Sequence, residues 1–293
     1  MLSHGLLNID KPSERTSRQV VDRVARLVRP AKAGHAGTLD PLATGVLVVC
    51  VGSATRLIEY VQQMPKSYRA TLLFGQSSPT DDVEGPITLE DDPRIPSVAE
   101  VATAAARFIG TIEQRPPDYS AVHVAGRRAY DLARRGQALD LAPRPVEVHD
   151  VRIIAYDYPE LVFDVDCGSG TYIRSLVRDL AAALGTTAVM SALVRTAIGD
   201  FKLADACALE DLDAATLAER LLPMRAAVPH LPEVQLSDEE QTRIVRGQTI
   251  RRPLASADRE WAAINSAGEL VAILARREDG SLGPTRVFAN QEP

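Results

Sequence analysis

The hydrophobic pattern changes period from one segment of the chain to the next. Apolar runs and apolar–polar alternation predict strands at 5–9, 46–51, 68–74, 161–167 and 188–195. A 3.6-residue period predicts a helix capped at Thr16 or Ser17 and ended by Pro30, and further helices at 55–62, 98–109 and 173–184. Strand-and-helix sets therefore flank an irregular, charged middle, which predicts an α+β fold with a central mixed or antiparallel β-sheet flanked by helices.

Prolines 223, 229 and 232 mark a boundary near the C-terminus. The residues beyond it predict a helix at 237–246 and β-like pieces at 261–264, 270–275 and 285–289. This pattern is typical of a small β-rich barrel, which would be marginally stable unless it packs on the rest of the chain. We therefore expect two domains, 1–228 and 229–293.

Composition narrows the class of protein. The chain has 293 residues, of which 45% are hydrophobic and 25% are charged, values typical of soluble globular proteins. No apolar run reaches the ~20 residues that span a bilayer, and the N-terminus lacks a signal-peptide pattern. Three cysteines without CxxC spacing argue against both a disulfide framework and a zinc cluster. These features predict a cytoplasmic protein that does not act at a membrane.

The net charge of −6 argues against a nucleic-acid partner, but the charge is unevenly spread. Residues 1–35 hold seven basic and three acidic side chains, and 115–145 hold six arginines and three aspartates. Acids concentrate in 77–100, which is expected to be a solvated loop. Arginine supplies 29 of the 33 basic residues. A GC-rich genome and recognition of phosphates by guanidinium groups both explain this bias.

The segment 34–45 holds the most informative motif, which reads GHAGTLDPLATG. Glycine, proline and threonine predict a loop of unusual backbone angles between a helix and a buried strand. Asp40 precedes Pro41, so its backbone is held extended. A carboxylate fixed in a mostly apolar loop suits covalent catalysis, although an aspartate that closes a turn fits the same spacing.

Other candidates are weaker when each is taken alone. His35 has no second ligand at metal spacing, and the GSG of 168–170 is a tight turn with Thr171 as the expected N-cap. Arg174 would lie on the first turn of the following helix, where the helix dipole disfavours a cation, so it is either solvated or paired with an anion. Tyr68 is a core aromatic or a platform for a base. The segment 115–130 suits an RNA backbone or an ordinary surface loop.

Taken together, these motifs resemble the TruB family, bacterial tRNA pseudouridine synthases that modify uridine 55 in the T arm. The resemblance is collinear from about residue 5 to 212. It rests on LNIDKP, the 34–45 loop, KSYR, PDYSA, GRRAY and GSGTYIR. The family implies a pseudouridine synthase catalytic domain with an RNA-binding insertion at about 75–145. It also implies, more weakly, a C-terminal PUA-like RNA-binding domain.

The resemblance assigns roles to matching positions. Asp40 corresponds to the catalytic nucleophile, Tyr68 to the tyrosine that stacks on the base and is implicated in loss of the C5 proton, and Arg174 to the arginine paired with the aspartate. That arginine would favour the ionised carboxylate. The remaining candidates are expected to contact or flank the RNA: His35, Leu193, Lys11, Tyr119, Arg127, Arg128 and Tyr130.

The implied reaction needs neither a cofactor nor a metal, because uracil is detached, turned and rejoined through C5. The carboxylate could attack C6 of the base or C1′ of the ribose, or assist a glycal route, and these alternatives stay open. The implied partner is the T arm of tRNA, whose target base is flipped into the enzyme. No obligatory protein partner is expected, and the chain should be a monomer.

Three alternatives remain at this level. The chain could be an RNA chaperone for which modification is secondary. It could be another carboxylate enzyme such as a glycoside hydrolase, but that needs a second catalytic acid, and the nearby acids outside the loop are Asp10 and Asp22. An RNA-guided synthase would be expected to carry a longer basic N-terminal extension and a fuller PUA domain.

Overall fold

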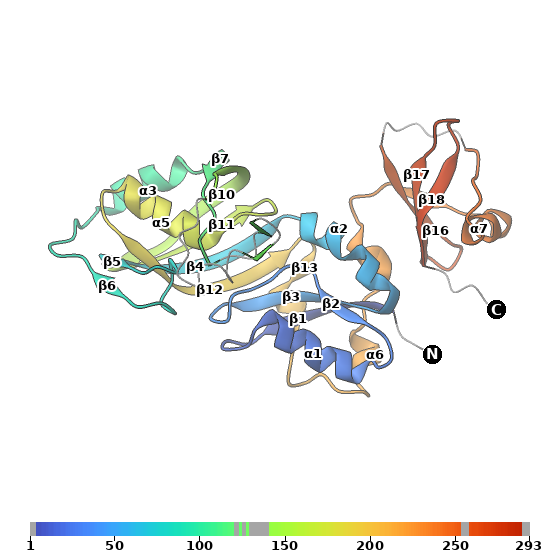
Figure 1. Ribbon diagram of the computed structural model, residues 1–293, viewed down its shortest axis with the longest axis horizontal. Coiled ribbons are helices and arrows are strands. Elements are labelled where there is room, and N and C mark those ends of the chain that lie inside the picture. The colour runs from blue at the N-terminus through green and yellow to red at the C-terminus, as the bar shows by residue number, and fades with distance from the viewer. Residues whose placement is uncertain (1–3, 120–122, 125–126, 129–140, 253–257, 289–293) are drawn as a thin grey trace.

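The structure is a computed structural model that describes residues 4–119, 123–124, 127–128, 141–252 and 258–288. The chain forms an elongated body with one long sheet and a smaller C-terminal sheet at one end (Figure 1). No helix in the described ranges is long and apolar enough to cross a membrane.

Ten strands among the described residues form one mixed sheet, which confirms the predicted fold class. Its main path is β14-β1-β3-β12-β4-β11-β10-β7, while β13 pairs with β12 and β2 with β3. In chain order the strands are β1 (Gly5–Lys11), β2 (Ala33–His35), β3 (Thr44–Val51), β4 (Lys66–Phe74), β7 (Gly110–Gln114), β10 (Arg144–Asp157), β11 (Glu160–Cys167), β12 (Ala188–Ile198), β13 (Phe201–Lys202) and β14 (Cys207–Ala208). The sheet thus places β3, β12 and β4 side by side at its centre.

Helices cover the two halves of this sheet differently. Helices α3 (Val98–Ala106) and α5 (Ile173–Ala183) lie together over β4, β11 and β10 and share one core with them (Figure 1). Helix α1 (Ser17–Leu27), capped by Thr16 as predicted, covers one face of β1 and β3. The opposite face of β1 and β3 packs against η1 (Gly52–Leu57), α2 (Ile58–Gln63) and η3 (Met224–Ala227). Burial on both faces explains the continuous apolar run of β3.

The C-terminal sheet has its own core and also packs on the first region. Its order is β15 (Glu233–Gln235), β16 (Glu260–Ile264), β17 (Leu270–Arg276) and β18 (Leu282–Val287), with α7 (Asp238–Val245) against it. Ile264, Ile273 and Phe288 join the core beneath η1 and α2. Arg286 adds a cation–π contact over Tyr60, with 4.9 Å between the guanidinium carbon and the ring centre. The two sheets therefore share buried surface.

The structure corrects the predicted middle of the chain. The stretch that was expected to be irregular contains β7 and β10, and β10 spans 14 residues. Sequence periodicity missed β10 because most of its side chains are exposed or half-buried. The expected helix 55–62 begins as the 3-10 helix η1 and becomes α-helical at Ile58. Residues 33–35 form strand β2, so the first two residues of the predicted 34–45 loop lie in a strand.

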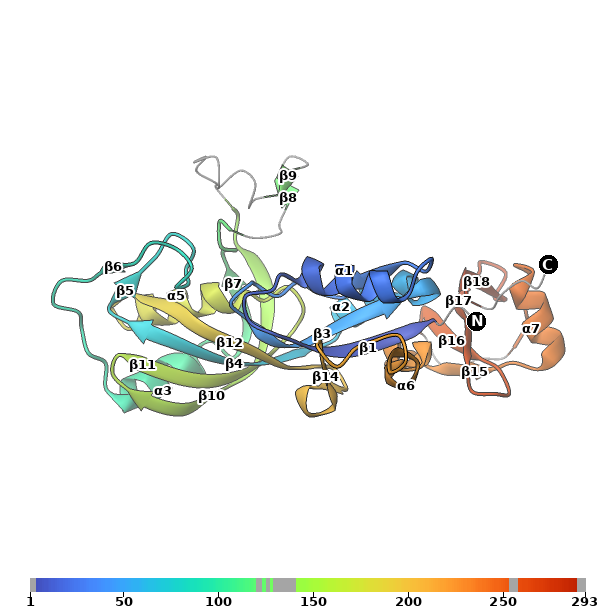
Figure 2. The same ribbon diagram turned by 90° about the horizontal axis from the view of Figure 1, so that it is seen from below.

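Short elements complete the fold. They are β5 (Gln76–Ser77), β6 (Thr88–Leu89), β8 (His123–Val124), β9 (Arg127–Arg128), η2 (Leu203–Asp205) and α6 (Leu217–Arg220). The hairpin β8–β9 stands away from the large sheet, on the side where α1 lies (Figure 2).

We expect Phe163→Ala to destabilise the protein by about 3–5 kcal/mol, because the ring is fully buried in the core under α3 and α5. Urea unfolding followed by circular dichroism measures this change. Ile154→Ala on the neighbouring strand β10 is the matched control, since Ile154 is exposed. Equal losses in the two variants would contradict the placement of this core.

Candidate active site

Asp40 lies in the loop between β2 and β3, and polar groups fix the backbone around it. The Ser17 hydroxyl accepts from the Leu39 amide at 2.8 Å and donates to the Leu39 carbonyl at 3.1 Å. Asp10 accepts from the Gly45 amide at 3.1 Å. Gly45 has a φ of 95°, and a Cβ there would collide with the backbone of Arg195, so only glycine fits. The loop therefore presents the Asp40 carboxylate from a rigid frame.

Lys11 supports this loop from inside. Its fully buried ammonium group donates to the carbonyls of Pro12 at 2.9 Å, Arg15 at 2.6 Å and Pro41 at 3.2 Å. Burial lowers the pKa of Lys11 to about 8, and the nearby carboxylate of Asp40 opposes that shift. The structure thus places Lys11 under the loop rather than at a surface that RNA could reach.

Arg195, at the end of β12, holds the other side of the loop. Its guanidinium group donates to the carbonyls of Val46 at 2.7 Å, Gly37 at 3.1 Å and Thr38 at 3.5 Å. The residue is only 2% exposed. Sequence reasoning missed this role. The available signal was an arginine within an apolar strand.

Arg174 faces Asp40 from the first turn of α5. Its Nε lies 3.0 Å from one carboxylate oxygen of Asp40, and its Nη2 donates to the other oxygen at 3.2 Å. The same guanidinium group donates to the carbonyls of Thr80 and Tyr119, each at 2.8 Å. The Arg174 side chain is 7% exposed and that of Asp40 is 32% exposed. The carboxylate is therefore half-buried while its cation is buried. This anion explains a cation at an otherwise unfavourable helix position.

Asp82 is a second acid at this site, and the sequence analysis missed it. Its side chain is 4% exposed and lies 3.5 Å from Arg174. Its carboxylate accepts from the Thr80 hydroxyl at 2.6 Å and from the Glu84 amide at 3.1 Å. The prediction of a solvated loop is therefore wrong at Asp82, as is the statement that Asp10 and Asp22 are the nearby acids. The many acidic residues of 77–100 gave no sign that one of them would be buried.

The same acidic segment makes further contacts with the body. Asp81 pairs with Arg178 at 3.0 Å, and Glu90 accepts from the hydroxyls of Thr186 and Thr187 at 3.0 and 2.9 Å. Much of the negative charge of 77–100 is therefore used inside the fold.

The electrostatics of Asp40 combine two opposing effects. Burial raises the pKa of Asp40, and the charge of Asp82 adds to that rise. The guanidinium group of Arg174 lowers the pKa, as the sequence analysis expected, but the net direction is upward. Arg174 therefore limits the rise in the pKa of Asp40 that burial causes.

Tyr68 and Leu193 lie beside this pair on the adjacent strands β4 and β12. Both side chains are buried, and they share a core cluster with Leu39 and Ala43 of the loop. Burial raises the pKa of Tyr68, whereas the charge of Arg195 and a hydrogen bond from it lower that pKa. The tyrosine is thus both a core residue and a neighbour of Asp40.

The other candidate residues occupy varied places. His35 ends β2 opposite Val49, so it lies on the approach to the loop. Tyr119 reaches the site through its backbone carbonyl, which accepts from Arg174. Arg127 and Arg128 form β9, whereas Tyr130 lies outside the described residues.

The predicted cap of α5 is wrong. The N-cap is Tyr172 rather than Thr171, whose hydroxyl instead donates to the Gly168 carbonyl at 3.2 Å. The side chain of Gln114 accepts from the Tyr172 amide at 2.8 Å and donates to the Tyr172 carbonyl at 3.0 Å. A residue distant in sequence therefore holds the backbone of the N-cap residue.

Comparison with family models decides the family. Residues 25–173 match the TruB family pseudouridylate synthase N-terminal domain, and residues 174–229 match the tRNA pseudouridylate synthase B C-terminal domain. The chain belongs to the TruB family. The first matched range contains Asp40 and Tyr68, and the second begins at Arg174.

Relatives and solved structures agree with this TruB assignment. The chain is 42% identical to a tRNA pseudouridine synthase B of Caulobacter sp. (strain K31), covering 97% of this chain and 96% of that protein. It is 40% identical to one of Dehalococcoides mccartyi (strain ATCC BAA-2266 / KCTC 15142 / 195), with coverages of 99% and 98%. The fold matches an H/ACA RNP bound to a substrate RNA containing 2'-deoxyuridine with a TM-score of 0.77, at 25% identity and coverages of 98% and 86%.

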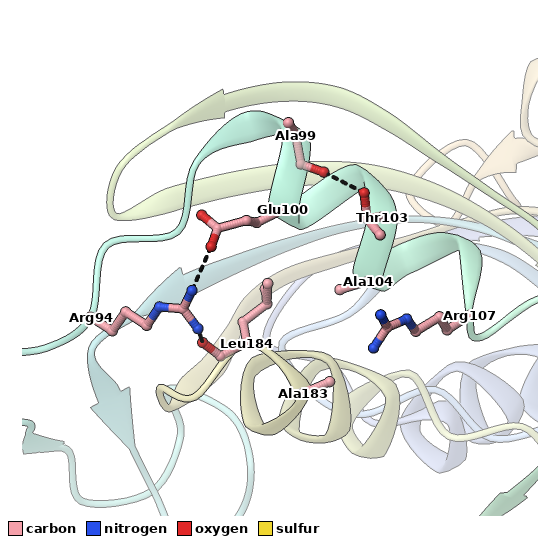
Figure 3. Close-up of a pocket in the computed structure, with 8 residues that line it drawn as sticks. All are labelled: Arg94, Ala99, Glu100, Thr103, Ala104, Arg107, Ala183 and Leu184. Atoms are coloured by element: carbon pink, nitrogen blue, oxygen red, sulfur yellow. Dashed lines mark hydrogen bonds and ion pairs between the residues drawn. The ribbon is translucent and has the colours of Figure 1, made fainter.

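A separate surface cavity of this TruB-family chain lies away from Asp40. It has a volume of about 290 Å³ and lies between α3 and α5, where Arg94 donates to the Leu184 carbonyl and pairs with Glu100 (Figure 3). None of the predicted site residues lines it. Among the described residues, no three His, Cys, Asp or Glu side chains gather closely enough to hold a metal ion.

We expect Asp82→Asn to slow isomerisation by about tenfold, equivalent to about 1.4 kcal/mol, because Arg174 loses one of its two carboxylates. The acid limb of the pH–rate profile should also move to lower pH, because the charge of Asp82 raises the pKa of Asp40. Single-turnover rates measured across the acid range test both effects. Asp81→Asn, which removes the partner of Arg178, should leave the limb in place. An unmoved limb in Asp82→Asn would contradict this electrostatic coupling.

Proposed function

We propose that this chain converts uridine 55 in the T arm of tRNAs to pseudouridine without a cofactor, with Asp40 as the catalytic carboxylate. The observation that carries the proposal is the ion pair between Asp40 and a buried Arg174, beside Tyr68. Membership of the TruB family and near-full-length relatives named tRNA pseudouridine synthase B support it.

The arrangement suits a base that is flipped out of RNA. Flipping the uridine out of the RNA costs a few kcal/mol, because base stacking is lost. Contacts of the base with the Tyr68 ring and the Leu193 side chain would offset part of that cost. Arg174 orients the carboxylate through two contacts and keeps it ionisable despite burial. In this proposal Tyr68 stacks on the base and takes part in loss of the C5 proton.

The RNA contacts belong to the same proposal. We expect domain 1–228 to carry the reaction, with the stretch 75–145 as its RNA-binding insertion, and 229–293 to act as a PUA-like RNA-binding domain. His35, Tyr119, Arg127, Arg128 and Tyr130 are proposed RNA contacts. The buried ammonium of Lys11 gives it a supporting role instead. We propose that the protein works in the cytoplasm as a monomer without an obligatory protein partner.

The structure and the relatives bear on the three alternative functions in different ways. Asp82 is a second acid, but its burial and its contacts with Thr80, Glu84 and Arg174 leave it unsuited to act on a sugar. The observation that favours the RNA-guided alternative is a structural match to the archaeal box H/ACA sRNP Nop10-Cbf5 complex, at 25% identity and a TM-score of 0.74. The two relatives described above, at 42% and 40% identity, are named tRNA pseudouridine synthase B. The Asp40→Asn variant described in the next paragraph distinguishes a chaperone role from catalysis.

We expect wild-type protein to release tritium from a T-arm stem-loop carrying 5-tritiated uridine at the target position. Asp40→Asn should abolish release, because the amide cannot supply the ionised carboxylate, while stem-loop affinity stays within a fewfold. Filter binding and tritium release are measured on the same preparation. Full activity in Asp40→Asn would refute the catalytic assignment. Complementation of a deletion strain by this variant would favour the chaperone alternative.

We also expect T-arm binding to weaken with salt, but only moderately. Part of the basic charge near the N-terminus is used internally, since Arg23 donates to the carbonyls of Leu209 and Leu212 and Arg18 pairs with Asp22. If about four phosphates are contacted, a plot of log affinity against log salt should have a slope of about −3. A titration series in potassium chloride measures it. A slope near zero would contradict the proposed contacts of local basic patches with RNA.

A further inference from the structure

Three cations are buried in the strands around Tyr68: Lys11 on β1, Lys66 on β4 and Arg195 on β12. Lys66 donates to the carbonyls of Gln62 and Met64, the latter at 2.6 Å. Lys11 and Arg195 likewise donate to backbone carbonyls. Among the described residues, none of the three forms an ion pair, although the carboxylate of Asp40 acts on Lys11 at longer range. The strands thus hold a group of positive charges whose direct hydrogen-bond partners are neutral carbonyls.

This arrangement is costly for a purely structural clamp. Taking an ion out of water costs several kcal/mol even in real proteins, and carbonyl dipoles recover only part of that. Arg174 is occupied by Asp40 and Asp82 on the other side of the site. The buried cations therefore leave a positive potential on the Tyr68 side.

Arg195 is the member of the group that is placed best to act on the site. It pairs with Tyr68 across β12 and β4 and holds Gly37 and Thr38 of the loop that presents Asp40. Its charge and a hydrogen bond from it also lower the pKa of Tyr68. One side chain thus connects both functional elements.

The reaction develops charge where this potential can act. When the bond between uracil N1 and ribose C1′ breaks, its electron pair stays with uracil, which becomes an anion. Attack at C1′ and the glycal route both release this anion, and addition at C6 places an equivalent charge on the ring as an enolate. Each of the three routes therefore gains from a fixed positive charge near the base.

We propose that Arg195, supported by Lys11 and Lys66, is a positioning residue that holds Tyr68 and the Asp40 loop and whose buried charge stabilises the uracil anion formed in the reaction. The inference rests on the proposed pseudouridine synthase function. It requires no proton transfer or electron transfer by Arg195 itself.

The test compares Arg195→Met and Arg195→Lys on two T-arm stem-loops, with uridine or 5-fluorouridine at the target position. Fluorine stabilises negative charge on the ring, so the substitution makes the reaction less dependent on the protein's charge. We expect Arg195→Met to lower the single-turnover rate of uridine conversion by about 100-fold. The loss with 5-fluorouridine should be about tenfold smaller, and Arg195→Lys should recover most of the rate. With 5-fluorouridine the C5–C1′ bond forms but C5 has no proton to lose, so the product is the 5-fluoro C-glycoside with water added across N1 and C6. Nucleoside mass spectrometry after digestion measures this product and pseudouridine.

The ratio of the two losses separates charge from structure, because a misfolded fraction lowers both rates equally. Equal rate losses on the two substrates would overturn the proposal. A uridine conversion rate in Arg195→Lys no higher than in Arg195→Met would also overturn it. Arg107→Met, which changes an exposed arginine next to α3, is the matched control and should lose nothing on either substrate. If Arg195→Met does not fold, Lys66→Met takes its place and must lose more rate on uridine than on 5-fluorouridine. Wild-type protein that converts neither substrate would instead refute the proposed function.

Discussion

The contact between Arg174 and Asp40 organises this molecule. One guanidinium group joins the carboxylate of the β2–β3 loop, the buried Asp82, and the carbonyls of Thr80 and Tyr119. These groups come from segments that lie far apart in the sequence. Because an unpaired buried charge is expensive, each segment is held to a position where the pairing is complete. The site is therefore fixed by the same interaction that fixes the fold around it.

The large sheet supplies the frame for that contact. Its order places β3, β12 and β4 next to one another, so the loop before β3, Arg195 on β12 and Tyr68 on β4 meet at one place. The helix α5 lies over β4 and β12 and brings Arg174 to the same point (Figure 1). Backbone carbonyls that the loop leaves unpaired are satisfied by Lys11 and Arg195, which makes the loop rigid.

The charge distribution looks different once the fold is known. The acids of 77–100 account for much of the net charge of −6, yet Asp81, Asp82 and Glu90 bind partners within the structure. Some arginines of the basic N-terminal segment are also engaged internally, as Arg23 shows. Net charge is therefore a poor guide to the surface that RNA would meet, since burial and pairing decide which charges remain available.

The main helices and central strands could be predicted from the sequence because their apolar periods are strong, and the TruB-like motifs singled out Asp40, Tyr68 and Arg174. The pattern missed the long strand β10, whose side chains are mostly outside the core, and the N-cap of α5, which is Tyr172, held by Gln114 of β7. It also missed Asp82 and the roles of Lys11 and Arg195 as buried donors. These features depend on the three-dimensional fold, because the burial and pairing of a polar group are set by partners that lie far away along the chain.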